Sequence, residues 1–145
     1  MFPTMSKSKR LKWASLGGLL ALFGLGAFLM AEKDETIAGY AGQDMFQLVE
    51  MNGKPVSKII MISFEENGRV TGQAPCNRYF ATQDAPLPWF KIGPIGATKM
   101  ACPDLGLEAQ YFELLGKVSL AEIAEDVLLL SDDNQVLLSF TRIKK

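Results

Sequence analysis

Two cysteines are the residues in this 145-residue chain whose type and placement point most directly to chemistry. Cys76 and Cys102 are the only cysteines present, and each lies beside a turn-forming residue. In an oxidising compartment such a pair is expected to form a disulfide that stabilises a small domain, whereas in a reducing compartment the two would remain buried thiols. A catalytic thiol is the least favoured interpretation, because the chain has no histidine to generate a thiolate.

The composition excludes several classes of active site. With no histidine, the chain has no Ser-His-Asp or Cys-His set and no imidazole ligand, and two cysteines are too few for an all-cysteine zinc site. The pairs Glu65-Glu66 and Asp132-Asp133 are interpreted as turn residues, because adjacent strand residues point to opposite faces. The balance of 15 Lys+Arg against 16 Asp+Glu argues against a nucleic-acid partner. We therefore expect no enzymatic activity, no metal and no other cofactor.

Polar residues next to the two cysteines form the remaining candidate site. If the cysteines pair, the segments that flank them meet. In the interpretation we favour, Asn77 and Thr98 hydrogen-bond to the loop backbone while Arg78 pairs with a carboxylate. In the alternative, the two segments line a shared binding surface. The candidate surface consists of Asn77, Arg78, Tyr79, Thr98, Lys99 and Met100.

The elements that must position these residues are mainly strands. Asn52-Gly53 and Glu66-Asn67-Gly68 are typical of tight turns between antiparallel strands. Residues 58–64 (KIIMISF) are apolar on both faces, as in a strand covered on both sides. Residues 75–105 are rich in Pro, Gly and Asp, and we expect irregular structure there.

The last third of the chain predicts one helix and a hairpin. Apolar residues recur with helical spacing from Asp104 to Lys117, and Pro103-Asp104 supplies a start signal. The apolar runs 127–130 and 136–140 flank a polar turn. Residues 45–145 are therefore predicted to form one small, mainly β (α+β) domain of antiparallel strands with one helix.

The N-terminal residues predict a transmembrane or signal helix. Residues 1–12 form a basic flank with four Lys or Arg, and residues 13–31 carry no charge. A helix of that length spans about 28 Å, close to the hydrocarbon thickness of a bilayer. We favour an uncleaved anchor over a cleaved signal, because the best cleavage sites lack a small residue at position −3. The basic flank places the N-terminus in the cytoplasm and the acidic domain outside. Residues 32–44 are predicted to be a linker.

Three segments carry a resemblance to a known family. They are GRVTGQAPCNRYFAT at 68–82, IGPIGATKMACP at 92–103 and LLLSDDNQVLLSFTR at 128–142, with the predicted helix between the last two. In this order they resemble the META/HslJ family of bacterial envelope proteins, from about Met45 to Arg142. Pro75 replaces the usual Gly before the first cysteine, and Phe46 stands where Trp is common.

The resemblance implies a fold and a cellular setting. The implied fold is an antiparallel, curved or barrel-like sheet with one helix, similar to that of certain secretion-pilot lipoproteins. Family members are mostly signal-bearing or lipid-anchored, and the namesake is a heat-inducible protein linked to antibiotic tolerance. No activity is established for the family, so the resemblance supplies no catalytic residue.

These observations lead to one main expectation and one alternative. We expect a non-enzymatic protein of the cell envelope, anchored in the inner membrane through residues 13–31 with its C-terminal domain in the periplasm. It would support envelope integrity or tolerance of heat and antibiotics by binding an unknown envelope protein or hydrophobic ligand. The alternative is a pilot-like or lipocalin-like carrier that binds a lipid or a hydrophobic peptide tail. If the signal is cleaved, the protein would instead be secreted to the periplasm.

Overall fold

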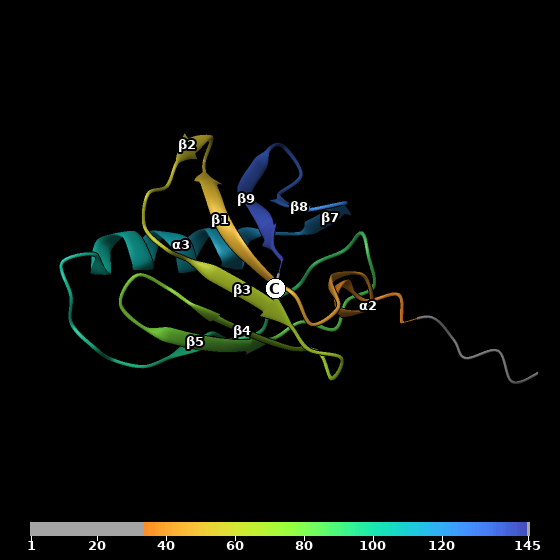
Figure 1. Ribbon diagram of the computed structural model, residues 1–145, viewed down its shortest axis with the longest axis horizontal. Coiled ribbons are helices and arrows are strands. Elements are labelled where there is room, and N and C mark those ends of the chain that lie inside the picture. Colours follow the sequence, from red (N-terminus) through yellow and green to blue (C-terminus); the bar gives the residue numbers. More distant parts are fainter. Residues whose placement is uncertain (1–33, 145) are drawn as a thin grey trace, which may run out of the picture. The chain divides into compact units, whose positions relative to one another are not determined.

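The computed structural model describes residues 34–144, and antiparallel strands make up most of this part of the chain (Figure 1). Within residues 34–144, neither helix has the length and apolar character that a membrane span requires. The predicted membrane or signal segment, 13–31, lies outside the described residues. In chain order the elements are α2 (Ile37–Ala41), β1 (Met45–Met51), β2 (Lys54–Pro55), β3 (Met61–Phe64), β4 (Arg69–Gln73), β5 (Arg78–Thr82), β6 (Gly96–Ala97), α3 (Leu105–Lys117), β7 (Leu120–Ala124), β8 (Val127–Ser131) and β9 (Val136–Ile143).

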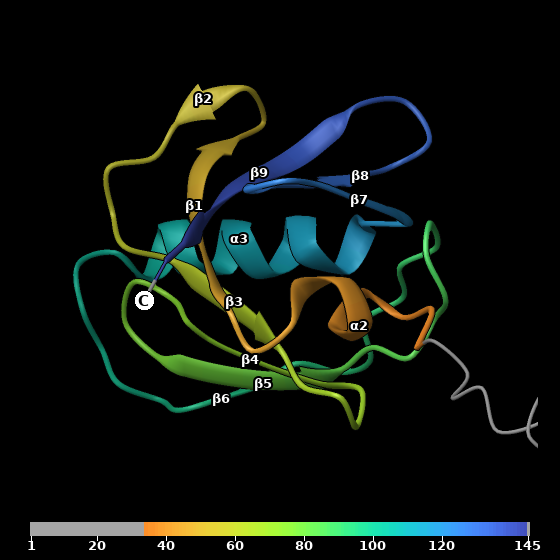
Figure 2. The same ribbon diagram turned by 45° about the vertical axis from the view of Figure 1, so that its right-hand side comes forward.

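The strands form one open antiparallel sheet against which α3 packs. The order across the sheet is β6-β5-β4-β3-β1-β9-β8-β7, and β2 pairs only with β1. Figure 2 shows the strands curving round α3, whose Tyr111, Leu114 and Leu115 are buried. The predicted mainly β fold with one packed helix is confirmed, but the sheet does not close into a barrel.

Proline content explains why the sheet remains open. The segment between β5 and β6 meets both edges: Trp89 bridges to Leu120 of β7, and the Gly93 N–H donates to the Thr82 carbonyl of β5. Prolines at 86, 88 and 94 have no N–H to donate to a ladder, so this segment cannot run as one continuous strand. Only the two residues of β6 extend the sheet on that side.

The tight turns lie where their residue types predict. Asn52 and Gly53 both have positive φ, as a two-residue hairpin turn requires, and they join β1 to β2. Gly68 has a φ of 78° in the turn between β3 and β4. The predicted helix and the β8–β9 hairpin are also present, whereas β7 was not predicted.

Three local predictions need correction, one of them only in part. The predicted linker contains α2, in which Ile37, Ala38 and Ala41 are buried in the core. Residues 75–105 are mostly irregular, as expected, but Arg78–Thr82 form a regular strand, β5. The outer face of β3 is not covered, because Ile59 just before it is 62% exposed and Met61 is only partly buried.

Candidate functional site

Asn77 is the residue that joins the two cysteine-flanking segments. It lies just before β5 and is 3% exposed. Its Oδ1 accepts hydrogen bonds from the Met100 N–H at 2.6 Å and from the Thr98 hydroxyl at 2.9 Å. Its Nδ2 donates to the Met100 carbonyl at 3.2 Å. The side chain therefore fixes the backbone of residues 98–101, which we call the 98–101 loop.

Glu108 holds the other side of Asn77. It lies in the first turn of α3 and is 5% exposed. Its Oε2 accepts the backbone N–H groups of Cys76 and Asn77, at 2.8 and 2.9 Å, and its Oε1 accepts Asn77 Nδ2 at 2.7 Å. A buried carboxylate needs such donors to replace water, and the N-terminus of a helix favours its negative charge. Glu108 thus ties the turn before β5 to α3.

The disulfide predicted from the sequence is present. Cys76 and Cys102 are bonded, with their Cα atoms 5.7 Å apart. A further link lies just beyond Cys102, where Asp104 forms an ion pair with Lys58 at 3.1 Å. The disulfide, Asn77 and this ion pair together restrain the chain from the 98–101 loop to the start of α3.

Tyr79 is part of the core rather than of the surface. Its hydroxyl donates to the Met61 carbonyl at 2.9 Å and lies 2.6 Å from the Tyr111 hydroxyl, and its ring packs edge-on against the rings of Tyr111 and Phe112. Because its one proton goes to Met61, the hydroxyl of Tyr111 must be the donor between the tyrosines. Burial raises the pKa of both hydroxyls above the usual range, so both are neutral at physiological pH.

The predicted surface is therefore divided between buried and exposed residues. Asn77 and Tyr79 are buried, so the alternative in which all six residues line a surface does not hold for these two. Arg78 is exposed and forms no ion pair within residues 34–144, contrary to the expected carboxylate partner. The expected hydrogen bonding of Asn77 to the loop backbone is confirmed, whereas the Thr98 hydroxyl donates to the Asn77 side chain rather than to the backbone. The exposed members are Arg78, Thr98, Lys99 and Met100, the last 67% exposed.

Sequence reasoning missed Glu108 as a site residue, although the sequence contained a signal. Glu108, Tyr111 and Leu115 share the buried side of α3, at spacings of three and four residues. A carboxylate on the apolar stripe of a helix must have donors nearby, since an unpartnered buried charge is costly. The expected pairing of Cys76 with Cys102 already placed the turn at Cys76-Asn77 near the start of this helix. That turn was therefore the place to look for the donors.

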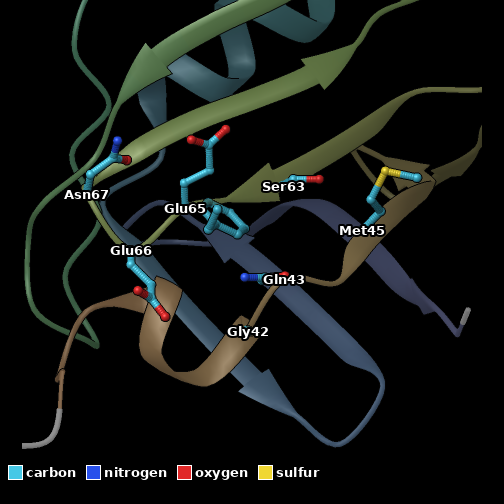
Figure 3. A pocket seen from close by; sticks show the side chains of 8 residues that line it. Gly42, Gln43, Met45, Ser63, Glu65, Glu66 and Asn67 are labelled. Atoms are coloured by element: carbon cyan, nitrogen blue, oxygen red, sulfur yellow. The ribbon is translucent and has the colours of Figure 1, made fainter.

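Surface hollows on the described part of the chain include three with defined linings. One, of 590 Å³, lies where α2 leads into β1 beside the turn that ends β3 (Figure 3). Glu65 and Glu66 both line it, but Figure 3 shows their carboxylates pointing in different directions. The others have volumes of 430 and 470 Å³. All three are open to solvent, so they do not resemble the enclosed cavity of a carrier.

A metal site is not evident in the described region. Among residues 34–144, no group of three or more His, Cys, Asp or Glu side chains is placed to hold an ion. The buried polar side chains are Asn77, Gln83 and Glu108, and each is hydrogen-bonded to protein groups. These buried polar side chains therefore serve to hold the fold together.

A sequence match over most of the domain just described identifies the family to which the chain belongs. The family model for the META domain matches residues 40–145, which contain every strand, α3 and both cysteines. The chain belongs to the META domain family. The predicted resemblance is confirmed, and it carries with it a family-level association with the cell envelope. A comparison with curated proteins found no match.

Solved structures support the fold of this META domain. A protein solved by NMR is 24% identical, with a TM-score of 0.56, and the match covers 77% of this chain and 95% of that one. Another NMR structure, from Burkholderia xenovorans, is 19% identical with a TM-score of 0.61, over 81% and 94% of the two chains. A crystal structure of a DUF4847 family protein from Bacteroides vulgatus is 17% identical with a TM-score of 0.60, over 75% and 99%. At these identities the likeness shows the fold alone.

Proposed function

We propose that this META domain protein acts in the cell envelope by binding rather than by catalysis, and that it supports envelope integrity or tolerance of heat and antibiotics. The observation that carries the proposal is the contrast within the cysteine-flanking segments. Asn77 and the disulfide fix the 98–101 loop from inside, while Lys99 and Met100 face solvent. A loop that is already rigid loses little conformational entropy when it binds.

The non-enzymatic part of the proposal is supported by the chemistry of the polar groups. The chain has no histidine, and its buried carboxylate, Glu108, has its oxygens occupied by N–H groups of the adjacent turn. The buried tyrosine hydroxyls are likewise bonded to each other and to a backbone carbonyl. These groups stabilise the fold and are not open to a substrate.

The proposed anchor is supported by the sequence before the described domain. Residues 1–12 contain four basic residues and no acidic one, and they are followed by an uncharged stretch of membrane-spanning length, 13–31. N-terminal sequencing of the protein recovered from membranes tests this proposal. A mature N-terminus at or near Glu32 would contradict an uncleaved anchor. Protease added to spheroplasts should digest the META domain if it lies outside the cytoplasmic membrane.

The binding role is tested by complementation of a strain that lacks the gene. The double variant Lys99→Glu with Met100→Ser changes only exposed side chains and should fail to restore survival under heat or antibiotic stress. The matched control, Lys91→Glu with Val127→Ser, makes the same kind of change at exposed positions outside the loop and should complement fully. Full complementation by the first variant, at equal protein level, would refute a binding role for the loop.

A further inference from the structure

A groove separate from the 98–101 loop lies between the β1–β2 hairpin and α3. Its volume is 430 Å³. Met51 and Val56 from the hairpin side and Leu107 from α3 supply its apolar lining, and these three side chains are buried or partly buried. Figure 2 shows the hairpin at β2 standing beside the first turns of α3. The groove therefore offers an apolar floor that an inserted side chain could cover.

The rim of the groove is basic in a domain that is otherwise acidic. Lys54 and Lys58 both line it, both are exposed, and no Asp or Glu is among the lining residues. Residues 34–144 as a whole hold nine Lys or Arg against fifteen Asp or Glu. Lys58 has Asp104 as an ion-pair partner, whereas Lys54 has none within the described residues. This local reversal of charge favours an anionic occupant.

Pro55 determines how an occupant could be recognised. β2 pairs with β1 on one side only, so it has a free edge. Strand addition to that edge would need backbone donors, and Pro55 has no N–H. Recognition must therefore rely on the side chains that line the groove.

We propose that this groove binds an acidic, amphipathic peptide segment of another protein. A large apolar side chain of the peptide would occupy the floor at Met51, Val56 and Leu107, and flanking carboxylates would pair with Lys54 and Lys58. The N-terminal residues of the same chain do not fit, because residues 1–31 carry four basic charges and no acidic one. The site goes beyond the proposed function, which uses the 98–101 loop, and it can be tested independently.

The test uses the full-length protein in neutral detergent micelles and a library of short random peptides on beads. Peptides that combine Asp or Glu with Leu, Ile, Phe or Met should be enriched, and binding should weaken as salt rises. The double variant Lys54→Glu with Lys58→Glu should bind the enriched peptides about tenfold more weakly or worse. Leu107→Ala should also weaken them, through the smaller apolar floor.

A matched control variant tests whether peptide binding depends on the lysines of the groove. Lys91→Glu with Lys144→Glu makes the same charge change at exposed lysines outside the groove, and it should leave peptide binding unchanged. Equal urea midpoints would show that each variant is folded. The proposal is overturned if no acidic peptide is enriched, or if both double variants bind equally. Binding only to phosphatidylglycerol vesicles would overturn it in favour of a lipid surface, and self-association that depends on Lys54 and Lys58 would overturn it in favour of a second copy of the chain.

Discussion

Replacing Glu108 by alanine is predicted to destabilise the META domain by about 3–5 kcal/mol. The substitution removes the acceptor of three N–H groups, those of the Cys76 backbone, the Asn77 backbone and the Asn77 amide. The amide keeps a second acceptor, the Met100 carbonyl, but the two backbone donors lose the only acceptor the structure provides for them. Each buried donor left without a partner costs about 1–3 kcal/mol, and a hydrogen bond to a charged group contributes about 1.5–3. The predicted loss is about a fifth or more of the stability of a typical domain, which is about 5–15 kcal/mol.

The assay is urea unfolding of the full-length protein in neutral detergent with the disulfide intact. Hydrogen exchange at the amides of Cys76 and Asn77 gives a local measurement, and both amides should exchange faster in the variant. Glu113→Ala is the matched control, because Glu113 lies on the same helix but is exposed and, among the described residues, pairs only with Lys117. The control should leave the unfolding midpoint almost unchanged, since exposed ion pairs contribute little.

Glu108→Gln refines the test. A glutamine can still accept the two backbone N–H groups with its carbonyl oxygen, but its amide then faces the Asn77 amide, donor against donor. Its loss of stability should therefore lie between those of wild type and Glu108→Ala. If Glu108→Ala costs less than about 1 kcal/mol, or if amide exchange at Cys76 and Asn77 is unchanged, the carboxylate does not hold this turn and the reasoning is wrong.

The other predictions concern the core around the same site. Tyr111→Phe should cost about 1 kcal/mol, but Tyr79→Phe about 2–3, because only the second leaves a buried donor, the Tyr111 hydroxyl, without an acceptor. Since burial raises the pKa of both hydroxyls, their contribution to the unfolding free energy should be complete below about pH 10 and lost as pH rises further, which urea unfolding at several pH values measures. The disulfide closes a loop with a sequence separation of 26, and its reduction should lower the free energy of unfolding by about 3.5 kcal/mol in the chain-entropy model. An unchanged urea midpoint for the reduced protein would contradict this. Gly72→Ala should fold poorly, because a Cβ there would come within 2.5 Å of the Tyr79 ring and closer to the Met61 carbonyl, whereas Gly106→Ala meets nothing and should raise the melting temperature.

Local rules predicted the parts of the fold that local chemistry determines. The Asn52-Gly53 turn follows from the ease with which these residue types adopt positive φ, and α3 follows from apolar residues at helical spacing. Helix α2 could not be predicted in this way. It has five residues, too few to show a period, and it forms because Ile37, Ala38 and Ala41 are buried in the tertiary core.

The candidate site was predicted in part, and its main error had a detectable cause. The compartment argument predicted the disulfide, and the polar residue types predicted the bonds of Asn77 to the loop backbone, but not that the Thr98 hydroxyl donates to the Asn77 side chain. Placing Arg78 and Tyr79 on one surface ignored strand alternation, since adjacent residues of β5 point to opposite faces. Glu108 was missed for a different reason: its partners lie 31 and 32 positions earlier in the chain, and only the folded chain brings them together.

The division between buried and exposed residues in the cysteine-flanking segments determines which experiments inform on function. A substitution at Asn77 or Glu108 changes the geometry of the 98–101 loop along with the stability of the domain, so a resulting loss of stress tolerance would not distinguish binding from folding. Lys99 and Met100 are exposed, and no hydrogen bond or ion pair of their side chains within residues 34–144 would be lost on substitution. If variants at Lys99 and Met100 remain as stable as wild type yet fail to complement, the loop acts by contact with a partner. If only the buried substitutions fail, the same segments serve the fold alone.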